Sequence, residues 1–183
     1  MRTLRTVEPF DCGALHCTER LQSRQPASNK ASDPRGQVTA GVVYLPAMDK
    51  LYAATAQGAA TLNGVDIRAS APKAEPRVLT SKSTLAPDHW PGGVPVLHRH
   101  FRAGMAWRLC LVAEGAFDAM LTLRPSWEWD IAAGALIAQR AGARVSDRHG
   151  QDLRFNAADP RSAGVIAASP DLHADLIARL SPQ

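Results

Sequence analysis

Cysteine is scarce in this 183-residue sequence, and its three cysteines, Cys12, Cys17 and Cys110, cannot all pair within one chain. A disulfide-stapled secreted scaffold is therefore excluded, and a reducing cytoplasmic setting is expected. No apolar stretch is long enough to span a bilayer, and the first residues lack the apolar run of a signal peptide. A peripheral association with the inner membrane stays open.

The sequence also has only a small net charge and few aromatic side chains. The formal net charge is +4, aromatic residues make up 5% of the chain, and no stretch gathers Lys and Arg with interleaved aromatics. This pattern argues against a groove for a nucleic-acid polymer and favours a small anionic substrate. Hydrophobic residues still make up 45% of the chain, many of them alanine, so we expect a globular domain with a core of small side chains.

The character of the chain changes near residue 37. The second half of segment 1–37 has neither a period of 2 nor one of 3.6 and is rich in turn-forming residues, which predicts a poorly structured or altered N-terminal segment. After it, β-branched runs alternate with turns, and Asn63-Gly64 is typical of a type I′ hairpin turn. Residues 38–70 are therefore predicted to form an antiparallel meander, which opens a domain over residues 38–183.

Strand and helix patterns alternate in the second half of the chain. Apolar residues at helical spacing predict a helix from Met105 that ends before Gly115, and a small-residue helix is expected over residues 130–141. Ser169 and Pro170 are the expected N-cap and first residue of a terminal helix. Strands are expected over residues 78–81, 96–100, 117–123, 144–146 and 164–168. The sequence thus predicts an α/β fold, an antiparallel meander followed by a mixed sheet with flanking helices.

Asp130 is the residue to which this pattern points for chemistry. It stands where a loop is expected to become a helix, and Ala132, Ala133 and Gly134 leave the first turn of that helix unobstructed. A carboxylate there can cap the helix, which stabilises it by ~1 kcal/mol, or it can act as a hard oxygen ligand for a divalent cation. The backbone N–H groups of such a turn can also attract a phosphate. Capping and ligand binding both stay open at this point.

A longer set of stretches resembles a known family. These stretches are residues 41–46, 62–64, 104–115, 128–134 and 141–150. The last two stretches resemble the C-terminal signature of the inositol monophosphatase family of magnesium-dependent, lithium-sensitive phosphatases. That signature consists of Trp-Asp, small residues, a helix ending in Ala-Gly, a strand and an Asp before a glycine turn. The resemblance covers residues 38–180. The Glu-Trp-Asp and Leu-Val-Ala-Glu-Gly stretches look most like its 3′(2′),5′-bisphosphate nucleotidase branch, the CysQ type.

The resemblance implies the C-terminal portion of the inositol monophosphatase fold and a Mg²⁺-dependent phosphomonoesterase that is inhibited by Li⁺. Its implied substrates are bisphosphate nucleotides such as 3′-phosphoadenosine 5′-phosphate, hydrolysed to AMP and phosphate. Asp130 matches the family's catalytic, metal-bridging aspartate. The residues implied to contact the substrate are Gly104, Met105, Ala106, Arg108 and Glu128. Met105 departs from the family's usual Ser, Arg108 stands where nucleotidases often have Lys, and Glu128 either contacts substrate or neutralises a neighbouring arginine.

The family's other acidic ligands have weaker counterparts here. They come from an N-terminal Glu-Glu helix, which is not found, and from an Asp-Pro-Ile/Leu-Asp-Gly-Thr turn. The nearest match to that turn is Glu8-Pro9-Phe10-Asp11, in which Glu8 and Asp11 are the candidate ligands. A single carboxylate does not hold magnesium. An inositol-1-phosphate phosphatase and a catalytically impaired, truncated family member are therefore the alternatives to an active nucleotidase.

Three other features have alternatives of their own. His98 and His100 alternate on an expected strand, so both imidazoles share a face that suits a transition metal, unless they are ordinary surface histidines. The proline-rich residues 86–95 form either a mobile rim of the site or a simple connection. A family member with an altered N-terminal half leaves sheet edges and an apolar face bare, so either self-association into a homo-oligomer or poor solubility is expected.

Overall fold

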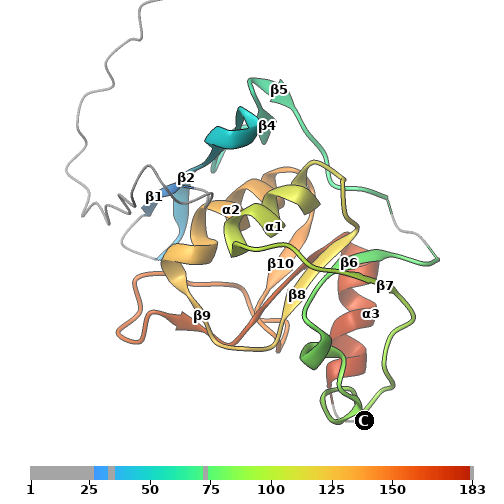
Figure 1. The fold of residues 1–183 in the computed structure, drawn as a ribbon. Coiled ribbons are helices and arrows are strands. Elements are labelled where there is room, and N and C mark those ends of the chain that lie inside the picture. The colour runs from blue at the N-terminus through green and yellow to red at the C-terminus, as the bar shows by residue number, and fades with distance from the viewer. Residues whose placement is uncertain (1–26, 33–35, 72–73, 182–183) are drawn as a thin grey trace, which may run out of the picture.

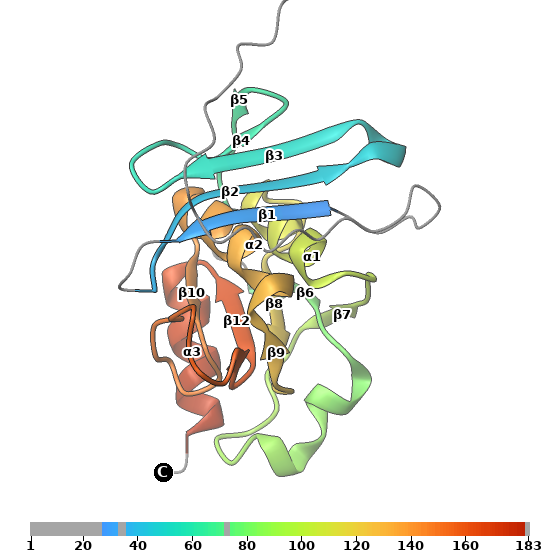
Figure 2. The ribbon, with the colours of Figure 1, turned by 90° about the vertical axis from the view of Figure 1, so that its left-hand side faces the viewer.

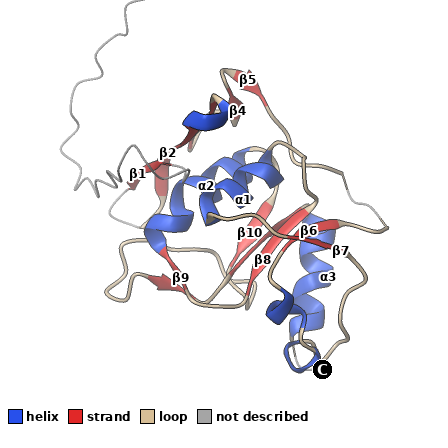
Figure 3. Ribbon diagram, in the orientation of Figure 1, coloured by secondary structure: helices blue, strands red, loops and turns tan. Residues whose placement is uncertain are grey.

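The computed structural model describes residues 27–32, 36–71 and 74–181, and every structural statement below concerns these residues. Strands and short 3₁₀ turns make up the described chain before residue 105, and α-helices alternate with strands after it, as Figure 3 shows. No helix within it is both long enough and apolar enough to cross a membrane.

The elements form four layers: an antiparallel sheet, a pair of helices, a mixed sheet and a single helix. The three helices are α1 (Met105–Ala113), α2 (Glu128–Arg140) and α3 (Pro170–Leu180). Figure 2 shows α1 and α2 between the two sheets, and Figure 1 shows α3 packed against the mixed sheet from its other side. The predicted α/β fold class, a meander followed by a mixed sheet with flanking helices, is confirmed.

The first sheet is the predicted meander with one strand added. It is antiparallel throughout, in the order β1 (Ala27–Ser32), β2 (Val38–Leu45), β3 (Lys50–Thr55), β4 (Thr61–Leu62) and β5 (Val65–Asp66). The loop between β4 and β5 consists of Asn63 and Gly64, whose φ angles are 50° and 82°. Both are positive, as a type I′ turn requires, so the predicted hairpin is confirmed.

Strand β1 lies within the segment expected to be poorly structured, and here the structure differs from that expectation. Its residues pair with β2 from Ala27 opposite Tyr44 to Ser32 opposite Val38. The sequence of β1 has no alternation of apolar and polar residues that could predict a strand. Its extended conformation comes from backbone hydrogen bonds to β2. The proposed division of the chain at residue 37 stays a prediction.

The second sheet mixes parallel and antiparallel pairs. Its order is β10 (Arg144–Ser146), β12 (Val165–Ala168), β8 (Ala119–Thr122), β6 (Arg77–Leu79) and β7 (His98–His100). β6 runs parallel to both β7 and β8, whereas β12 runs antiparallel to both β8 and β10. A separate two-stranded sheet pairs β9 (Ser126–Trp127) with β11 (Arg161–Ser162) just before α2.

The helix boundaries follow the sequence signals at α1 and α3. α1 ends before Gly115, which has a φ of 72° that a side chain rarely tolerates. α3 begins at Pro170 after Ser169, as predicted, but the Ser169 hydroxyl makes no capping bond and is buried without a hydrogen-bond partner. Three short 3₁₀ turns complete the described elements: Pro46–Met48, Lys82–Leu85 and Pro87–His89.

The proline-rich residues 86–95 are tied to α3 and not to the start of α2. Trp90 is buried and packs in one apolar cluster with Leu176, and its indole N–H donates to the Thr84 carbonyl at 2.8 Å. The backbone N–H of Gly92 donates to the Arg179 carbonyl at 3.0 Å. These contacts favour the simple connection over the mobile rim.

Two glycines allow the layers to approach closely. A Cβ on Gly41 in β2 would lie 2.9 Å from the backbone of Ala133 in α2. A Cβ on Gly134 would lie 2.9 Å from Leu109 Cβ and 3.1 Å from the Ala106 carbonyl oxygen, both in α1. Such distances leave no room for a side chain, so β2, α2 and α1 pack backbone against backbone.

Replacing Gly134 by Ala should destabilise the protein. Overpacking of a well-packed core costs ~1–3 kcal/mol, and neither the Leu109 Cβ nor the Ala106 carbonyl can swing aside. The gain in helix propensity is at most ~1 kcal/mol, so we expect a net loss, measured as a lower urea midpoint. Gln139→Ala, on the exposed side of the same helix, is the control and should change the stability by less than ~0.5 kcal/mol. Equal stability of Gly134→Ala and wild type would contradict the close packing.

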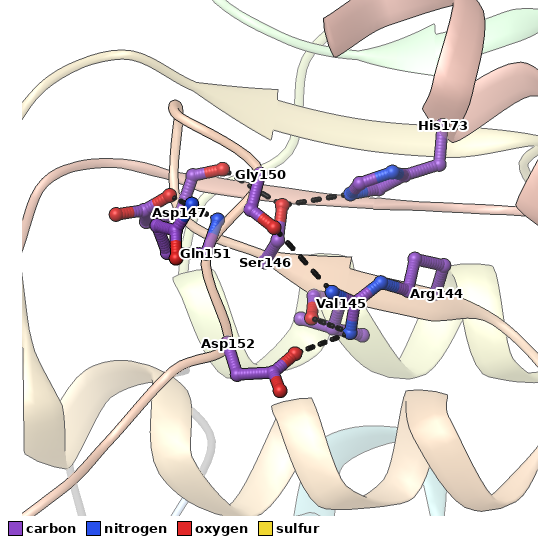
Figure 4. Close-up of polar contacts among 8 residues, drawn as sticks. All are labelled: Arg144, Val145, Ser146, Asp147, Gly150, Gln151, Asp152 and His173. Carbon is purple, nitrogen blue, oxygen red and sulfur yellow. Dashed lines mark hydrogen bonds and ion pairs between the residues drawn. The ribbon is translucent and has the colours of Figure 1, made fainter.

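A buried histidine joins α3 to the end of β10. His173 Nε2 lies 2.7 Å from the Ser146 hydroxyl, which donates its own proton to the Asp147 carbonyl at 2.8 Å (Figure 4). The imidazole must therefore donate from Nε2. Burial, with a smaller contribution from nearby Arg144, lowers the pKa of His173 from 6.5 to about 4. Arg144 itself is paired with Asp152 at 2.6 Å.

His173 should make the protein less stable in mild acid. Between pH 6.5 and 4, His173 binds a proton in the unfolded chain but stays neutral in the folded chain. The free energy of unfolding therefore falls as the pH falls. The expected loss from this group is ~2 kcal/mol between pH 7 and pH 5, measured by urea unfolding at both values. His173→Gln should flatten this dependence, whereas His149→Gln, at an exposed position, should not. Parallel pH profiles for wild type and His173→Gln would contradict the assignment.

Candidate functional site

The start of α2 differs from its prediction by two residues. The helix begins at Glu128, directly after β9, so Trp127 is the N-cap residue and Asp130 is the third residue of the first turn. Of the two roles left open for Asp130, capping of the helix is therefore excluded. Pairing of β9 with β11 brings the chain into the helix early, because the Glu128 N–H donates to the Pro160 carbonyl at 2.9 Å.

Asp130 is nevertheless placed for interaction with a ligand. Its side chain is exposed and makes no hydrogen bond or ion pair with any described residue. Partial withdrawal from water raises the pKa of its carboxyl group above the usual value. A carboxylate in the first turn is also favoured by the helix dipole. Asp130 is therefore a carboxylate with no structural partner in the described part of the chain.

Glu128 has a structural role that the sequence did not indicate. Its carboxylate is buried and accepts the backbone N–H groups of Asn156 at 2.7 Å and Ala157 at 3.2 Å. It thus ties the first residue of α2 to the loop before β11. These two bonds are neither of the predicted roles, which were substrate contact and neutralisation of an arginine. They hold the backbone around Asp130 in place.

The predicted substrate residues gather at the start of α1. Gly104 is the N-cap residue with a φ of 76°, and Met105 and Ala106 are the first two helical residues. The Gly104 carbonyl accepts the Arg108 N–H at 3.2 Å, the first bond of the helix. The backbone N–H groups at this end have no helical partner, so they can bind an anion.

Arg108 is the most unusual residue of this group. Its side chain folds back against the turn before α1: the guanidinium donates to the Arg102 carbonyl and lies 4.5 Å from the centroid of the Phe101 ring. The residue is buried, and burial lowers the pKa of the guanidinium. It forms no ion pair with a described carboxylate. A buried cation without an acidic partner is costly, so it marks a place where an anion is favoured.

The packing of the helices brings Arg108 and Asp130 to the same end of the pair. The Ala69 N–H donates to the Ala141 carbonyl just after α2, and a Cβ on Gly115, just after α1, would lie 3.1 Å from the Arg68 carbonyl oxygen. Both helices therefore end beside the same segment. They run in the same direction, side by side as Figure 1 shows, and their first turns share one end of the layer.

Two aromatic residues at this end were missed in the sequence. The rings of Trp127 and Trp129 are stacked, with centroids 4.7 Å apart and planes inclined by 12°. Alternating tryptophans in Ser-Trp-Glu-Trp-Asp were the available signal. Alternation predicts a shared face only for a strand, and the chain changes from strand to helix between these two residues.

The described residues do not by themselves form a metal site. No group of three or more His, Cys, Asp or Glu residues able to hold an ion occurs among them. Magnesium requires several oxygen ligands, and Asp130 offers one carboxylate. Glu8 and Asp11, the other predicted ligands, lie outside the described residues. His98 is bound to Glu75 at 2.9 Å and His100 packs edge-on against Phe117, and they likewise have no third ligand in the described part of the chain.

The fold and the site define a layered α/β protein in which a helix start that is able to bind an anion and a carboxylate without a described partner lie at the same end of a helix pair. The sequence profile of the inositol monophosphatase family matches residues 32–183. The chain therefore belongs to the inositol monophosphatase family, as the resemblance predicted.

The curated relatives that this chain resembles are named for different functions. CysQ of Escherichia coli, a 3′(2′),5′-bisphosphate nucleotidase, is 32% identical over 131 residues, which are 69% of this chain and 53% of CysQ. Inositol monophosphatase 3 of Solanum lycopersicum is 32% identical over 130 residues, 65% of this chain and 48% of the relative. The putative Nus factor SuhB of Neisseria meningitidis is 41% identical over 75 residues, 40% of this chain and 26% of the relative.

Solved structures agree with the fold. Staphylococcal IMPase-II superposes with a TM-score of 0.75 at 19% identity, over 86% of this chain and 64% of that chain. An IMPase of Thermotoga maritima superposes with a TM-score of 0.70 at 26% identity, over 85% and 60%. The chain thus spans about half the length, or less, of the curated relatives it matches.

Replacing Glu128 by Gln should loosen the loop before β11. Gln keeps one carbonyl oxygen but loses the charge that accepts two backbone N–H groups, which should cost ~1–3 kcal/mol of unfolding free energy. Hydrogen exchange at Asn156 and Ala157 should accelerate and reports the loss directly. The exposed Asp159, paired with Arg161, offers the control Asp159→Asn, which should leave the stability nearly unchanged because solvent screens an exposed ion pair. Unchanged exchange at residues 156 and 157 would contradict the positioning role.

Proposed function

We propose that this chain is a phosphomonoesterase of the inositol monophosphatase type that acts on small anionic phosphate esters. The observation that carries the proposal is the presence, at one end of the helix layer, of two charged side chains that have no described ion-pair partner. Arg108 is a buried cation without a described acidic partner, and Asp130 is a carboxylate without a described cationic partner. Membership of a family of phosphatases supports the same conclusion.

The binding of the phosphate group follows from the charges. An anion at the start of α1 would compensate the buried guanidinium of Arg108 and accept hydrogen bonds from the free backbone N–H groups of residues 105 and 106. Met105, where the family usually has Ser, contributes only its backbone to such a site. Gly104 supports it through the positive φ that turns the chain into the helix.

We propose Mg²⁺ as the cofactor and Asp130 as one of its ligands, with Li⁺ as an inhibitor. Glu8 and Asp11 stay the candidates for further ligands. The support for this part is family membership and the hard oxygen donor that Asp130 offers, and the described residues alone do not fit a complete site.

Among substrates we propose 3′(2′),5′-bisphosphate nucleotides, such as 3′-phosphoadenosine 5′-phosphate. The similarity to CysQ of Escherichia coli over 69% of this chain supports this choice. Inositol 1-phosphate is the alternative, supported by the tomato inositol monophosphatases. A cytoplasmic location and self-association are proposed on the sequence arguments given above.

Phosphate release tests the proposal. The full chain should release inorganic phosphate from 3′-phosphoadenosine 5′-phosphate in the presence of Mg²⁺, and Li⁺ should inhibit the release. Asp130→Asn removes the ligand charge at nearly constant shape and should lower kcat/KM by at least ~100-fold, equivalent to ~3 kcal/mol of transition-state stabilisation. The measurement is a phosphate assay on both chains.

Asp88→Asn is the matched control, because Asp88 is an exposed carboxylate in a 3₁₀ turn of the connection that packs on α3. It should leave the rate unchanged. A pure wild-type chain that releases no phosphate from either the nucleotide or inositol 1-phosphate at any Mg²⁺ concentration would reject the proposal and favour the catalytically impaired family member.

A further inference from the structure

The first sheet has an exposed apolar face on the side away from the helices. Gly41 packs against Ala133 of α2, and side chains alternate along a strand, so Val42 and Tyr44 point away from that helix. Val42 is 37% exposed, Tyr44 is 39% exposed, and Leu51, the cross-strand partner of Tyr44, is 42% exposed. The described helices that pack on this sheet, α1 and α2, lie on its opposite face (Figures 1 and 2).

The residue pattern of β2 is that of a strand covered on both faces. Antiparallel strands with one face in water alternate apolar and polar residues, whereas strands covered on both faces have nearly continuous apolar runs. Residues 41–45, Gly-Val-Val-Tyr-Leu, form such a run. The described part of the chain covers one of the two faces, so we expect a further layer on the other.

The exposed face contains two rows of side chains that run across the strands. In the first row Tyr44 lies opposite Leu51, and both side chains are large. In the second row Val42 lies opposite Ala53, and Ala53 lies opposite Thr61, all with smaller side chains. The rows are two residues apart along each strand, which corresponds to ~7 Å. A row of large side chains therefore lies beside a row of small ones.

The charges at this face favour neither an anionic membrane nor a strongly charged partner. The two rows contain no Asp, Glu, Lys or Arg within β2, β3 and β4. Lys50, which begins β3, points to the opposite face, where its ammonium group lies 2.8 Å from the Glu114 carboxylate. The adjoining turn and strand carry Asp49 and Asp66, which are exposed and acidic. Anionic lipids attract basic segments, so an acidic margin disfavours them.

A second copy of the chain fits these features. The rows themselves are uncharged, so two identical faces do not repel each other there. A two-fold axis that runs parallel to the rows, midway between them, places the large row of one copy on the small row of the other. Tyr44 of one copy then lies opposite Val42 of the other, and Leu51 lies opposite Ala53. Large side chains opposite small ones let two packed layers interdigitate.

We propose that the outer face of the first sheet is the surface through which two copies of this chain associate. The inference rests on the self-association proposed above and names its surface, and it does not involve Arg108 or Asp130. The longest strands of the sheet are β2, with eight residues, and β1 and β3, with six each, so the face is small. A small interface forms a weak dimer, whose population depends on the protein concentration.

Sedimentation velocity of the full chain over a range of concentrations tests the surface. Wild type should pass from monomer to dimer as its concentration rises to ~0.1 mM. The double variant Tyr44→Thr/Leu51→Thr keeps good strand formers but removes the large row. It should raise the dissociation constant of the dimer by at least ~100-fold, because each substitution acts twice in a two-fold interface. Its circular dichroism spectrum should match that of wild type.

Two further sets of variants make the test specific. Val96→Thr is the control, because Val96 is 79% exposed but precedes β7 of the other sheet, and it should leave the dimer unchanged. Val42→Lys and Tyr44→Glu should each be monomeric alone. A mixture of these two chains should form a mixed dimer, because the two introduced charges then face each other.

Four results would overturn the inference. A wild-type chain that stays monomeric at ~0.1 mM would favour another segment of the chain as the cover. A dimer that persists in Tyr44→Thr/Leu51→Thr would keep self-association but assign it to another surface. A mixture of Val42→Lys and Tyr44→Glu that stays monomeric would reject the arrangement of the rows. Binding to phosphatidylcholine–phosphatidylglycerol vesicles that the double variant loses would assign the face to a membrane.

The outcome is independent of catalysis. A dimer that depends on Tyr44 and Leu51 in a chain that releases no phosphate supports the surface while rejecting the phosphatase. Phosphate release from a wild-type chain that stays monomeric overturns the surface and leaves the phosphatase intact.

Discussion

The close contact between α1 and α2 at Gly134 is the constraint on which the candidate site depends. Without a Cβ at this position, the Ala106 carbonyl and the Leu109 side chain of α1 lie directly against α2. The two helices therefore run side by side in the same direction, and their first turns meet at one end. Arg108 and Asp130, which are distant in sequence, are brought to that end by packing alone.

The charges at this end fall into two kinds. Glu128 is fully engaged, since its buried carboxylate holds the backbone N–H groups of a neighbouring loop. Asp130 and Arg108 have no described ion-pair partner, although the first lies on the surface and the second is buried. Structural carboxylates in a protein are usually satisfied, so groups that are left without a partner at the same end of the helix pair are those that a ligand can use. The adjacent stacked tryptophans add an apolar surface to a site otherwise defined by charge.

Much of the fold could be predicted because its local signals are strong. The Asn63-Gly64 turn, the glycine that ends α1 and the Ser169-Pro170 start of α3 each depend on backbone preferences of a few neighbouring residues. Strand β1 could not be predicted in this way. It has no apolar period, and its conformation is imposed by pairing with β2.

For the site, the sequence determined the chemistry, namely a carboxylate at Asp130, a guanidinium at Arg108 and small residues that permit close packing. These follow from residue identity and from motif resemblance, which do not depend on coordinates. Three features were decided by the tertiary structure alone: α2 begins at Glu128, the Glu128 carboxylate binds the backbone of a loop, and Trp127 stacks on Trp129. The physical reason is that each of these depends on a partner far along the chain, β11 and its preceding loop or the neighbouring layer, and no local preference specifies such a partner.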